Sequence, residues 1–361
     1  MSPFFFQKYW HIVGNDVIEA ILSILRSAHM LKKMNHIHIV LIPKKKDPKY
    51  LADYRPISLS NVVSRIISKV IANRLKLILP NMISDSHAFM PNHLITDNTT
   101  IAYEILHRMR NRRRGKVGQM VVKLDISKAN DRVEWSFLQG IVQKLGFDPR
   151  WVKLAMETVI TASYSVFING EPKGWITQSR GIRQGDLLSP YLFLLCAEGL
   201  KALLNKAVEN GVVNGIMSCQ NGVCISHLLF ADDSLLFCKA TVGECQQLLS
   251  ILGQYEAASG QAINRQKTSL FFSKNTNPKI LRRLIQQQMG ARVMTNSDKY
   301  LGLPMTCGKS RVNTFNKNSQ ACVGVEGEVF IKGRSGGPYK NSGTSNPHIC
   351  HEPFQASQIH V

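Results

Sequence analysis

Three acidic residues stand where their type and spacing could support chemistry. Asp232 and Asp233 lie between two apolar runs in the segment HLLFADDSLLF, and Asp125 follows the apolar run of VVKLD. Apolar runs on both sides predict a buried hairpin, and a buried carboxylate pair is costly unless cations neutralise it. A hard divalent cation with oxygen ligands would do so. The competing interpretation is structural: a solvated Asp-Asp turn, and for Asp125 a turn or a helix cap.

The charge of the chain bears on this choice. Its 361 residues include 45 Lys and Arg against 24 Asp and Glu, which gives a formal net charge of +21 at pH 7. Such an excess favours a polyanionic partner, nucleic acid first and an acidic membrane second. On so basic a chain, the three aspartates indicate a two-metal site that activates a 3′-hydroxyl and stabilises the leaving pyrophosphate.

Composition excludes several other classes of protein. With 44% hydrophobic and 19% charged residues, the chain can bury a core. No run approaches the roughly 18 apolar residues that span a bilayer. The eight cysteines are scattered without a CxxC pair, which argues against a disulfide framework or a zinc ribbon and for a reducing compartment.

Local patterns predict a mixture of helices and strands that would position the aspartates. Helices are predicted over 15–32 with Asn15 as cap, 61–79 ended by Pro80, 96–110, 189–205 opened by Ser189-Pro190, and 244–258. Strands are predicted over 37–42, 117–124, 163–168, 174–177, 225–230, 234–238 and, as the last, 269–273. Asn169-Gly170 marks a hairpin turn. Asp125 would then follow one strand, and Asp232-Asp233 would join two others.

Seven segments in a fixed order make the assignment more specific. They read LIPKKKDPKYLADYRPISLSNVVSRIISKVIANRL, AFMPNHLITDN, KLDISKANDRVEW, RGIRQGDLLSPYLF, FADD, GQAINRQKTSL and YLGLP. Over roughly residues 5–312, the chain resembles the reverse transcriptase of a LINE-type (non-LTR) retrotransposon, of the kind abundant in plants. FADD alone would be a weak match, but seven ordered blocks are hard to obtain by chance.

The resemblance implies an α+β right-hand polymerase fold and RNA-directed DNA synthesis. Fingers would occupy residues 1–115 and an antiparallel palm sheet with helices residues 116–312, while the thumb would be missing or degenerate. The implied partners are an RNA template, a DNA primer and deoxynucleoside triphosphates, without a membrane, and the implied cofactor is Mg²⁺ or Mn²⁺. An intracellular retroelement protein belongs in the nucleus or cytoplasm. The alternatives are an inactive remnant that at most binds nucleic acid, and an intron-encoded maturase, against which RPISL and YLGLP count.

The same resemblance assigns roles residue by residue. Asp125, Asp232 and Asp233 match the metal-binding aspartates, with Asp125 and Asp232 as the main ligands. Lys267 matches a lysine near the triphosphate, a candidate proton donor to pyrophosphate. The implied nucleotide-binding positions are Lys45, Arg55, Ile126, Asn130, Gln184 and Gly185. The basic run 110–116 is expected to follow a nucleic-acid backbone, or else to be a solvated loop.

Several positions depart from the family pattern. Asn130 replaces an aromatic residue that blocks a 2′-hydroxyl, so discrimination against ribonucleotides should weaken. Leu187 replaces a proline and His93 an arginine. We expect residues 313–361 to be an aberrant tail, because a one-nucleotide shift from Asn316 can restore a peptide resembling the family's continuation. The nucleotide sequence of the gene would decide this.

Overall fold

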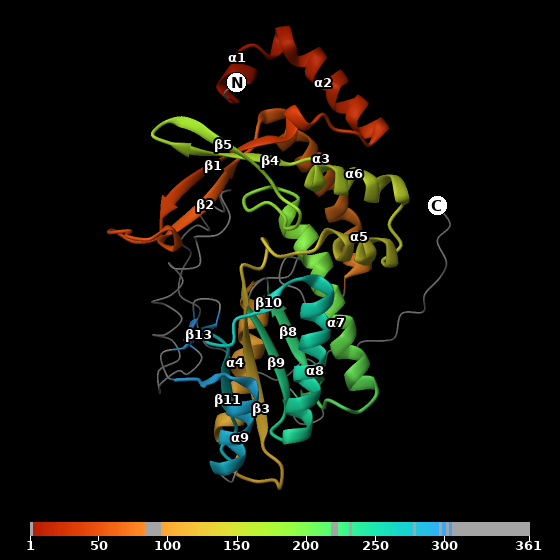
Figure 1. Ribbon diagram of the computed structural model, residues 1–361. Helices are drawn as coiled ribbons and strands as arrows, with labels where there is room; N and C mark the ends of the chain where they lie inside the picture. The colour runs from red at the N-terminus through yellow and green to blue at the C-terminus, as the bar shows by residue number, and fades with distance from the viewer. Residues whose placement is uncertain are drawn as a thin grey trace, which may run out of the picture. The chain divides into compact units, whose positions relative to one another are not determined.

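The computed structural model describes residues 3–83, 95–217, 223–230, 233–276, 279–295, 298–300 and 303–304, all within one compact unit of residues 1–318 (Figure 1). The second unit, 319–361, lies outside the described residues. So does the whole stretch from 313 onward, and the proposed tail therefore stays a prediction. Within the described ranges, none of the helices has the length and apolar character needed to cross a membrane.

Helices and strands are mixed along the chain, as the sequence predicts. The helices are α1 (Pro3–Lys8), α2 (Trp10–Ser27), α3 (Val62–Met82), α4 (Ile95–Asn111), α5 (Trp135–Lys144), α6 (Pro149–Ile160), α7 (Ser189–Glu209), α8 (Val242–Ser259) and α9 (Lys279–Met289), with short 3₁₀ turns η1 (Lys32–Asn35) and η2 (Leu51–Asp53). The strands are β1 (His36–Pro43), β2 (Tyr54–Leu59), β3 (Gln119–Ser127), β4 (Ser163–Ile168), β5 (Glu171–Thr177), β6 (Ile216–Met217), β7 (Cys224–Ile225), β8 (His227–Phe230), β9 (Asp233–Lys239), β10 (Ala262–Ile263), β11 (Ser269–Phe272), β12 (Arg292–Val293), β13 (Lys299–Tyr300) and β14 (Leu303–Pro304).

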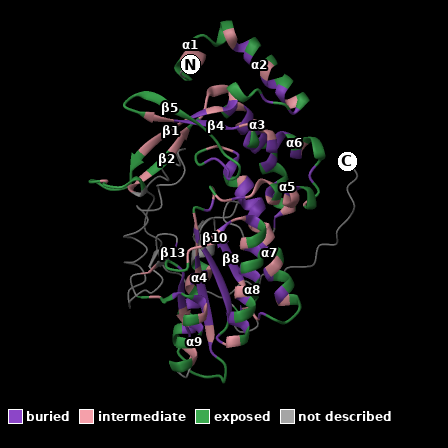
Figure 2. Ribbon diagram, in the orientation of Figure 1, coloured by how far each residue is buried: buried purple, intermediate pink, exposed green. Residues whose placement is uncertain are grey.

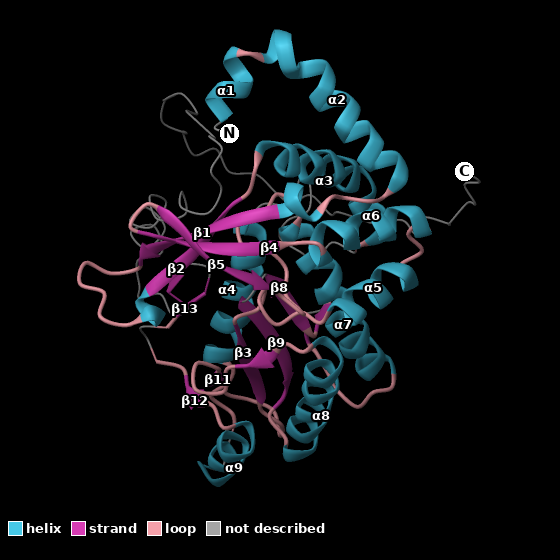
Figure 3. Cartoon of the chain, turned by 45° about the horizontal axis from the view of Figure 1, so that its top comes forward, coloured by secondary structure: helices cyan, strands magenta, loops and turns pink. Residues whose placement is uncertain are grey.

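Four strands in the order β2-β1-β4-β5 form one sheet, which we call the N-terminal sheet. β1 pairs antiparallel with β2 and parallel with β4, so strands from distant parts of the chain lie side by side (Figure 3). β4 and β5 are joined by the predicted Asn169-Gly170 turn, in which both residues have positive φ, 52° and 83°. The sheet therefore unites segments on both sides of residue 115, where the sequence suggests a domain limit.

The second sheet, which we call the central sheet, is built around β3. Its order is β12-β11-β3-β9-β8, and β10 also pairs with β3. One face of β3 is buried along its whole length, whereas the other face is buried at Val121 alone and is intermediate elsewhere (Figure 2). Met120, Val122 and Leu124 pack in the core shared with α7 and α8, whereas Val121 packs in the core shared with α4. Lys123 and Asp125 interrupt the apolar run of this strand on its less buried face.

A further core joins α2, α3, α5, α6 and the first half of α7. On α3, Ile67, Ile71 and Leu75 recur every four residues, which is the spacing of one helical face. The helix begins as predicted, because the Asn61 side chain accepts a hydrogen bond from the Ser64 amide at 2.8 Å.

Three predicted helix limits, in two helices, were wrong. α2 begins at Trp10, five residues before Asn15, and ends at Ser27 instead of continuing to residue 32. No side chain caps its first turn, so the sequence carries no signal for its start. α3 continues past Pro80 to Met82. A proline so near the end of a helix removes one of its last hydrogen bonds and leaves the preceding turns intact.

Three further local predictions were also wrong. Ser189 does not cap α7, because Leu188 precedes the helix without a side-chain bond from either residue to the first turn. The Leu188 amide instead donates to an oxygen of Asp186 at 3.2 Å. β3 extends to Ser127, so Asp125 lies within the strand and not after it. Finally, β12, β13 and β14 follow the strand that the sequence suggests is the last.

Candidate active site

Asp125 has a strand on each side. In the antiparallel ladder between β3 and β9, Asp125 is the partner of Asp233. On its other side, Ile126 is the partner of Ile263 in β10, and the Asn264 amide donates to the Asp125 carbonyl oxygen at 2.8 Å. Directly opposed residues of such a ladder have Cα atoms about 4.5–5.5 Å apart. Two aspartate positions that are far apart in the sequence therefore meet in the sheet.

The face of the sheet that carries Asp125 changes from apolar to polar along β3. Side chains alternate between the two faces of a strand, so Val121, Lys123 and Asp125 share one face. Val121 is fully buried against α4, whereas Lys123 and Asp125 are half-buried. The apolar packing thus stops short of Asp125 and leaves its carboxylate at a partly open, polar end of the sheet.

The donor set at this end suits a hard cation, as far as it is described. Asp232 lies outside the described residues, and Asp233 is described by its backbone alone. Among the described residues, no three His, Cys, Asp or Glu side chains gather as a metal site would require. Carboxylate oxygens at opposed positions of neighbouring strands are nevertheless the ligand type that Mg²⁺ takes.

The loop before α7 is held against the segment that follows β3. The Gly181 amide donates to the Val133 carbonyl at 2.7 Å, and the Ile182 amide donates to the Asn130 carbonyl at 2.8 Å. Gly181 has a φ of +92°, and a Cβ there would lie 2.7 Å from the Asp131 carbonyl oxygen. Only glycine satisfies both conditions. The exposed residues Gln184 and Gly185 therefore follow closely after Ile182, whose backbone is hydrogen-bonded to that of Asn130.

Arg183 fixes the same loop from the other direction. Its side chain is 4% exposed and lies 3.8 Å from a carboxylate oxygen of Asp186, which is 7% exposed. The guanidinium also donates to the Asn35 side chain, the Thr158 carbonyl and, at 3.3 Å, the Ser64 hydroxyl. Buried groups on η1, α3 and α6 therefore hold position 183, while the two residues that follow it face solvent.

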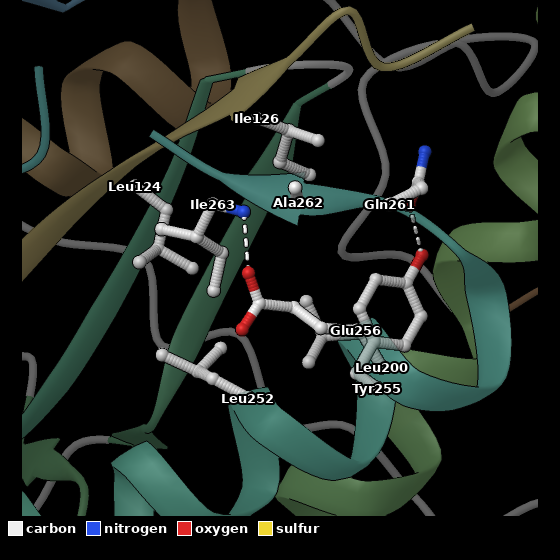
Figure 4. Close-up of a pocket in the computed structure, with 9 residues that line it drawn as sticks. All are labelled: Leu124, Ile126, Leu200, Leu252, Tyr255, Glu256, Gln261, Ala262 and Ile263. Atoms are coloured by element: carbon white, nitrogen blue, oxygen red, sulfur yellow. Dashed lines mark hydrogen bonds between the residues drawn. The ribbon is translucent and has the colours of Figure 1, made fainter. Parts of the chain in front are cut away.

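A second layer of contacts lies beneath β3, on the face opposite Asp125 (Figure 4). The Tyr255 hydroxyl donates to the Gln261 side chain at 2.6 Å, and the Gln261 amide donates to the Ala129 carbonyl at 2.8 Å. Burial raises the pKa of Tyr255, which keeps the phenol protonated as a donor. The Ile263 amide donates to Glu256 at 2.6 Å. These bonds fix β10 and the backbone next to Asn130.

A model of the family described as reverse transcriptase (RNA-dependent DNA polymerase) matches residues 42–305. The chain belongs to this reverse transcriptase family. The match covers the central sheet, the strands β2, β4 and β5 of the N-terminal sheet, the loop before α7 and the Asp125–Asp233 pairing, and it confirms the α+β polymerase fold expected from the sequence.

Two of the similar curated proteins are named as products of mobile elements. The chain is 29% identical over 271 residues to the transposon TX1 uncharacterized 149 kDa protein of Xenopus laevis, covering 73% of this chain and 20% of that protein. It is 28% identical over 287 residues to the retrovirus-related Pol polyprotein from type-2 retrotransposable element R2DM of Drosophila melanogaster, covering 76% and 25%. It is also 56% identical over 72 residues to the uncharacterized mitochondrial protein AtMg01250 of Arabidopsis thaliana, covering 20% and 59%.

The reverse transcriptase domain is thus of the non-LTR retrotransposon type, and it spans about a quarter or less of the length of the TX1 and R2DM relatives. Among solved structures, telomerase from Candida albicans in complex with a fragment of telomeric RNA is similar at 13% identity with a TM-score of 0.49, over 84% of this chain and 52% of that one.

The reverse transcriptase fold brings some predicted site residues together and leaves others apart. Lys267 is exposed in the turn between β10 and β11, and both of these strands pair with β3 around Asp125. Ile126 is 9% exposed and turns its side chain to the opposite face, so only its backbone is available to a nucleotide.

Lys45 and Arg55 lie on the N-terminal sheet and its connecting loop. Lys45 pairs with Asp53 at 2.9 Å, and its hydrogen bond lowers the pKa of that carboxyl. Arg55 is exposed on β2. No hydrogen bond or ion pair recorded among the described residues joins either side chain to the surroundings of Asp125.

Sequence reasoning missed the residues that support the site. Arg183 and Gln261 both stand in the matched blocks RGIRQGDLLSPYLF and GQAINRQKTSL, but neither received a role. Nothing in the sequence around Arg183 marks it as buried. For Gln261, the available signal was a side chain that can both donate and accept, set between Gly260 and apolar residues.

Proposed function

We propose that this domain copies an RNA template into DNA for a LINE-type retrotransposon, with Asp125, Asp232 and Asp233 holding Mg²⁺. The observation that carries the proposal is the cross-strand pairing of Asp125 with Asp233 at the polar end of the central sheet, in a chain of the reverse transcriptase family. When bound, the metal would stabilise negative charge on the attacking 3′-hydroxyl and on the leaving pyrophosphate. The Arabidopsis match supports a plant origin.

The surrounding residues would then bind and orient the nucleotide. Gln184 and Gly185 would contact the incoming nucleotide and the template, since the loop presents them to solvent between two buried anchors. Lys267 would lie near the triphosphate and donate a proton to pyrophosphate. Asn130 would stand beneath the sugar, where its small side chain admits a 2′-hydroxyl more readily than an aromatic ring. Lys45 and Arg55 would contact phosphates from the N-terminal sheet.

Extension of a DNA primer on an RNA template by the purified chain tests the proposal. We expect incorporation of deoxynucleotides that requires Mg²⁺ or Mn²⁺ and stops on removal of the metal by a chelator. Folded protein that binds the primer–template but extends nothing would contradict the proposal and identify an inactive remnant.

The N-terminal sheet offers a surface for the template strand. The rings of His36 and Trp175 stack with centroids 4.4 Å apart and an interplanar angle of 9°. Both nitrogens of His36 lie within hydrogen-bond distance of serine hydroxyls, Ser163 at 2.8 Å and Ser165 at 2.9 Å. Trp175 remains 62% exposed, so the side of its ring away from His36 is available to a base. Arg55 pairs with Ile42, which lies an even number of residues after His36 on β1. The ladder therefore puts Arg55 on the same face of the sheet as His36.

We predict that Trp175→Ala weakens binding of a primer–template with a single-stranded RNA overhang roughly 5- to 150-fold, the range that corresponds to loss of one base–aromatic stack of about 1–3 kcal/mol. Fluorescence anisotropy with a labelled overhang substrate measures this. Trp175→Phe, which keeps a ring, should lose much less. Trp10→Ala removes an exposed tryptophan from α2 and should have no effect. An equal loss for a blunt duplex would refute the assignment.

A further inference from the structure

Basic residues gather at the end of the central sheet that lies opposite Asp125. Lys116 precedes β3, Lys239 ends β9 and Lys274 follows β11. The ladders align these ends, since Gln119 pairs with Lys239 and Met120 pairs with Phe272. From residue 119 to residue 125, the strand advances 125 − 119 = 6 residues. At roughly 3.3 Å per residue, this end lies about 20 Å from Asp125.

The loop from α4 into β3 adds a cluster of arginines to the same end. The whole group, which we call the basal basic rim, consists of Arg108, Arg112, Arg113, Arg114, Lys116, Lys239 and Lys274. All of its members are exposed except Arg112, which is half-buried. His107 and Asn111 join the four arginines around a hollow of about 590 Å³. The rim thus combines a concave shape with a single sign of charge.

No carboxylate neutralises the rim within the described part of the chain. The ion pairs recorded there involve none of its seven members. Glu244 is close to Lys239, but it is 7% exposed and accepts from the Lys239 and Asn214 backbone amides at 3.0 Å. In addition, Nε of Arg112 is shielded from solvent without a hydrogen-bond acceptor. The clustered cations of the rim repel one another, and this repulsion destabilises the folded protein unless a bound anion offsets it.

The arginine loop is nevertheless held in one conformation by its backbone. The Asn275 side-chain amide lies 3.2 Å from the Arg114 carbonyl oxygen, 3.2 Å from that of Gly115 and 3.1 Å from that of Val117. The Asn275 backbone amide donates to the Arg112 carbonyl oxygen at 3.1 Å. The carbonyl groups are therefore engaged by one residue, and the four arginines line the hollow. The Arg108 guanidinium also donates to the Met217 carbonyl at 2.8 Å. Part of the ordering cost of binding is already met.

We propose that the basal basic rim binds the phosphate backbone of a nucleic acid, as a docking site separate from the polymerase site. Guanidinium groups match phosphate oxygens with paired hydrogen bonds. A membrane surface would also require an apolar face beside the cations, and the loop from 111 to 118 offers only Val117, which is 44% exposed. The proposal does not rest on catalysis, because an inactive chain would keep the same rim.

The test compares two variants that lose the same charge. In one, Arg112, Arg113 and Arg114 are changed to Gln. In the matched control, Arg26→Gln, Lys32→Gln and Lys33→Gln remove three exposed cations from α2 and η1. Binding of a labelled 20-nucleotide RNA and a labelled 20-base-pair DNA is measured between 50 and 300 mM salt, together with the thermal unfolding of each protein.

We expect the rim variant to bind at least tenfold more weakly at the lowest salt concentration. Its affinity should also depend less steeply on salt. If all three arginines contact phosphates, the magnitude of the slope of log K against log salt concentration should be smaller by about 2.7 for the DNA duplex, or by about 2.1 for the single-stranded RNA. The nucleic acid, RNA or duplex DNA, whose binding the substitutions weaken more is the one that the rim prefers. Equal losses in the control variant would overturn the proposal in favour of net charge alone. Unchanged binding by a folded rim variant would overturn it outright, as would tighter binding of anionic phosphatidylserine vesicles that displaces the RNA.

Discussion

Primer extension is expected to fall at least about a thousandfold when Asp125 is changed to Asn. The substitution keeps the size of the side chain and the backbone bond that the Asn264 amide donates to position 125, so β3 should still pair with β9 and β10. What is lost is one negative oxygen at the polar end of the sheet. A divalent cation supplies several kcal/mol of charge stabilisation in the transition state, and each 1.36 kcal/mol is a factor of ten in rate. Single-nucleotide incorporation, measured against Mg²⁺ concentration, reports both the rate and the metal dependence.

Two comparisons separate this role from a loss of folding. Asp131→Asn changes an exposed aspartate six residues away, whose backbone contacts Gly181, and it should leave the rate close to that of the wild type. Asp232→Asn should match Asp125→Asn, whereas Asp233→Asn should lose less, because that residue is the less direct ligand in the proposed set. Undiminished incorporation by Asp125→Asn would show either a contaminating polymerase or a site elsewhere.

Local patterns in the sequence were enough to predict some parts of the fold and of the candidate site. The Asn169-Gly170 turn, the helix from residue 61 and the apolar runs around Asp125 and Asp233 each follow from a few neighbouring residues. Ordered motifs added what no local pattern holds, namely the expectation that Asp125 and Asp233, more than 100 residues apart in the chain, lie close together. The pairing of these two positions between β3 and β9 agrees with it.

What could not be predicted depends on contacts between distant segments. The start of α2 lacks a capping side chain, so nothing in its own sequence marks it. β4 joins β1 through a parallel pairing that no turn signal specifies. Arg183 looks like a surface arginine until η1, α3 and α6 enclose it. The preference of an arginine for water is overcome there because both terminal nitrogens of the guanidinium find partners.

Changing Arg183 to Met is expected to lower the free energy of unfolding by about 3–5 kcal/mol, the usual cost of removing one member of a buried ion pair. Met fills a similar volume but leaves the Asp186 carboxylate, 7% exposed, without the cation that lies 3.8 Å away. One oxygen of that carboxylate already lacks a hydrogen-bond partner within the described residues. Urea denaturation followed by circular dichroism measures the change, provided that the slope with urea is unchanged. A loss within about 0.5 kcal/mol, typical of surface substitutions, would contradict the buried pair.

The double variant Arg183→Met, Asp186→Asn distinguishes stability from the positioning of the loop. Removing both charges should restore much of the lost stability, because replacement of a whole buried pair is often nearly neutral. The hydrogen bonds to Asn35, Ser64 and Thr158 stay lost, however. The loop that carries Gln184 and Gly185 is then no longer anchored to the buried groups of η1, α3 and α6. We therefore expect Arg183→Met to raise KM for the deoxynucleotide, and we expect KM to stay raised in the stabilised double variant. Arg183→Lys keeps the charge but not the planar fork, so its KM should lie between that of the double variant and that of the wild type. Recovery of KM together with stability would assign Arg183 a role in folding alone.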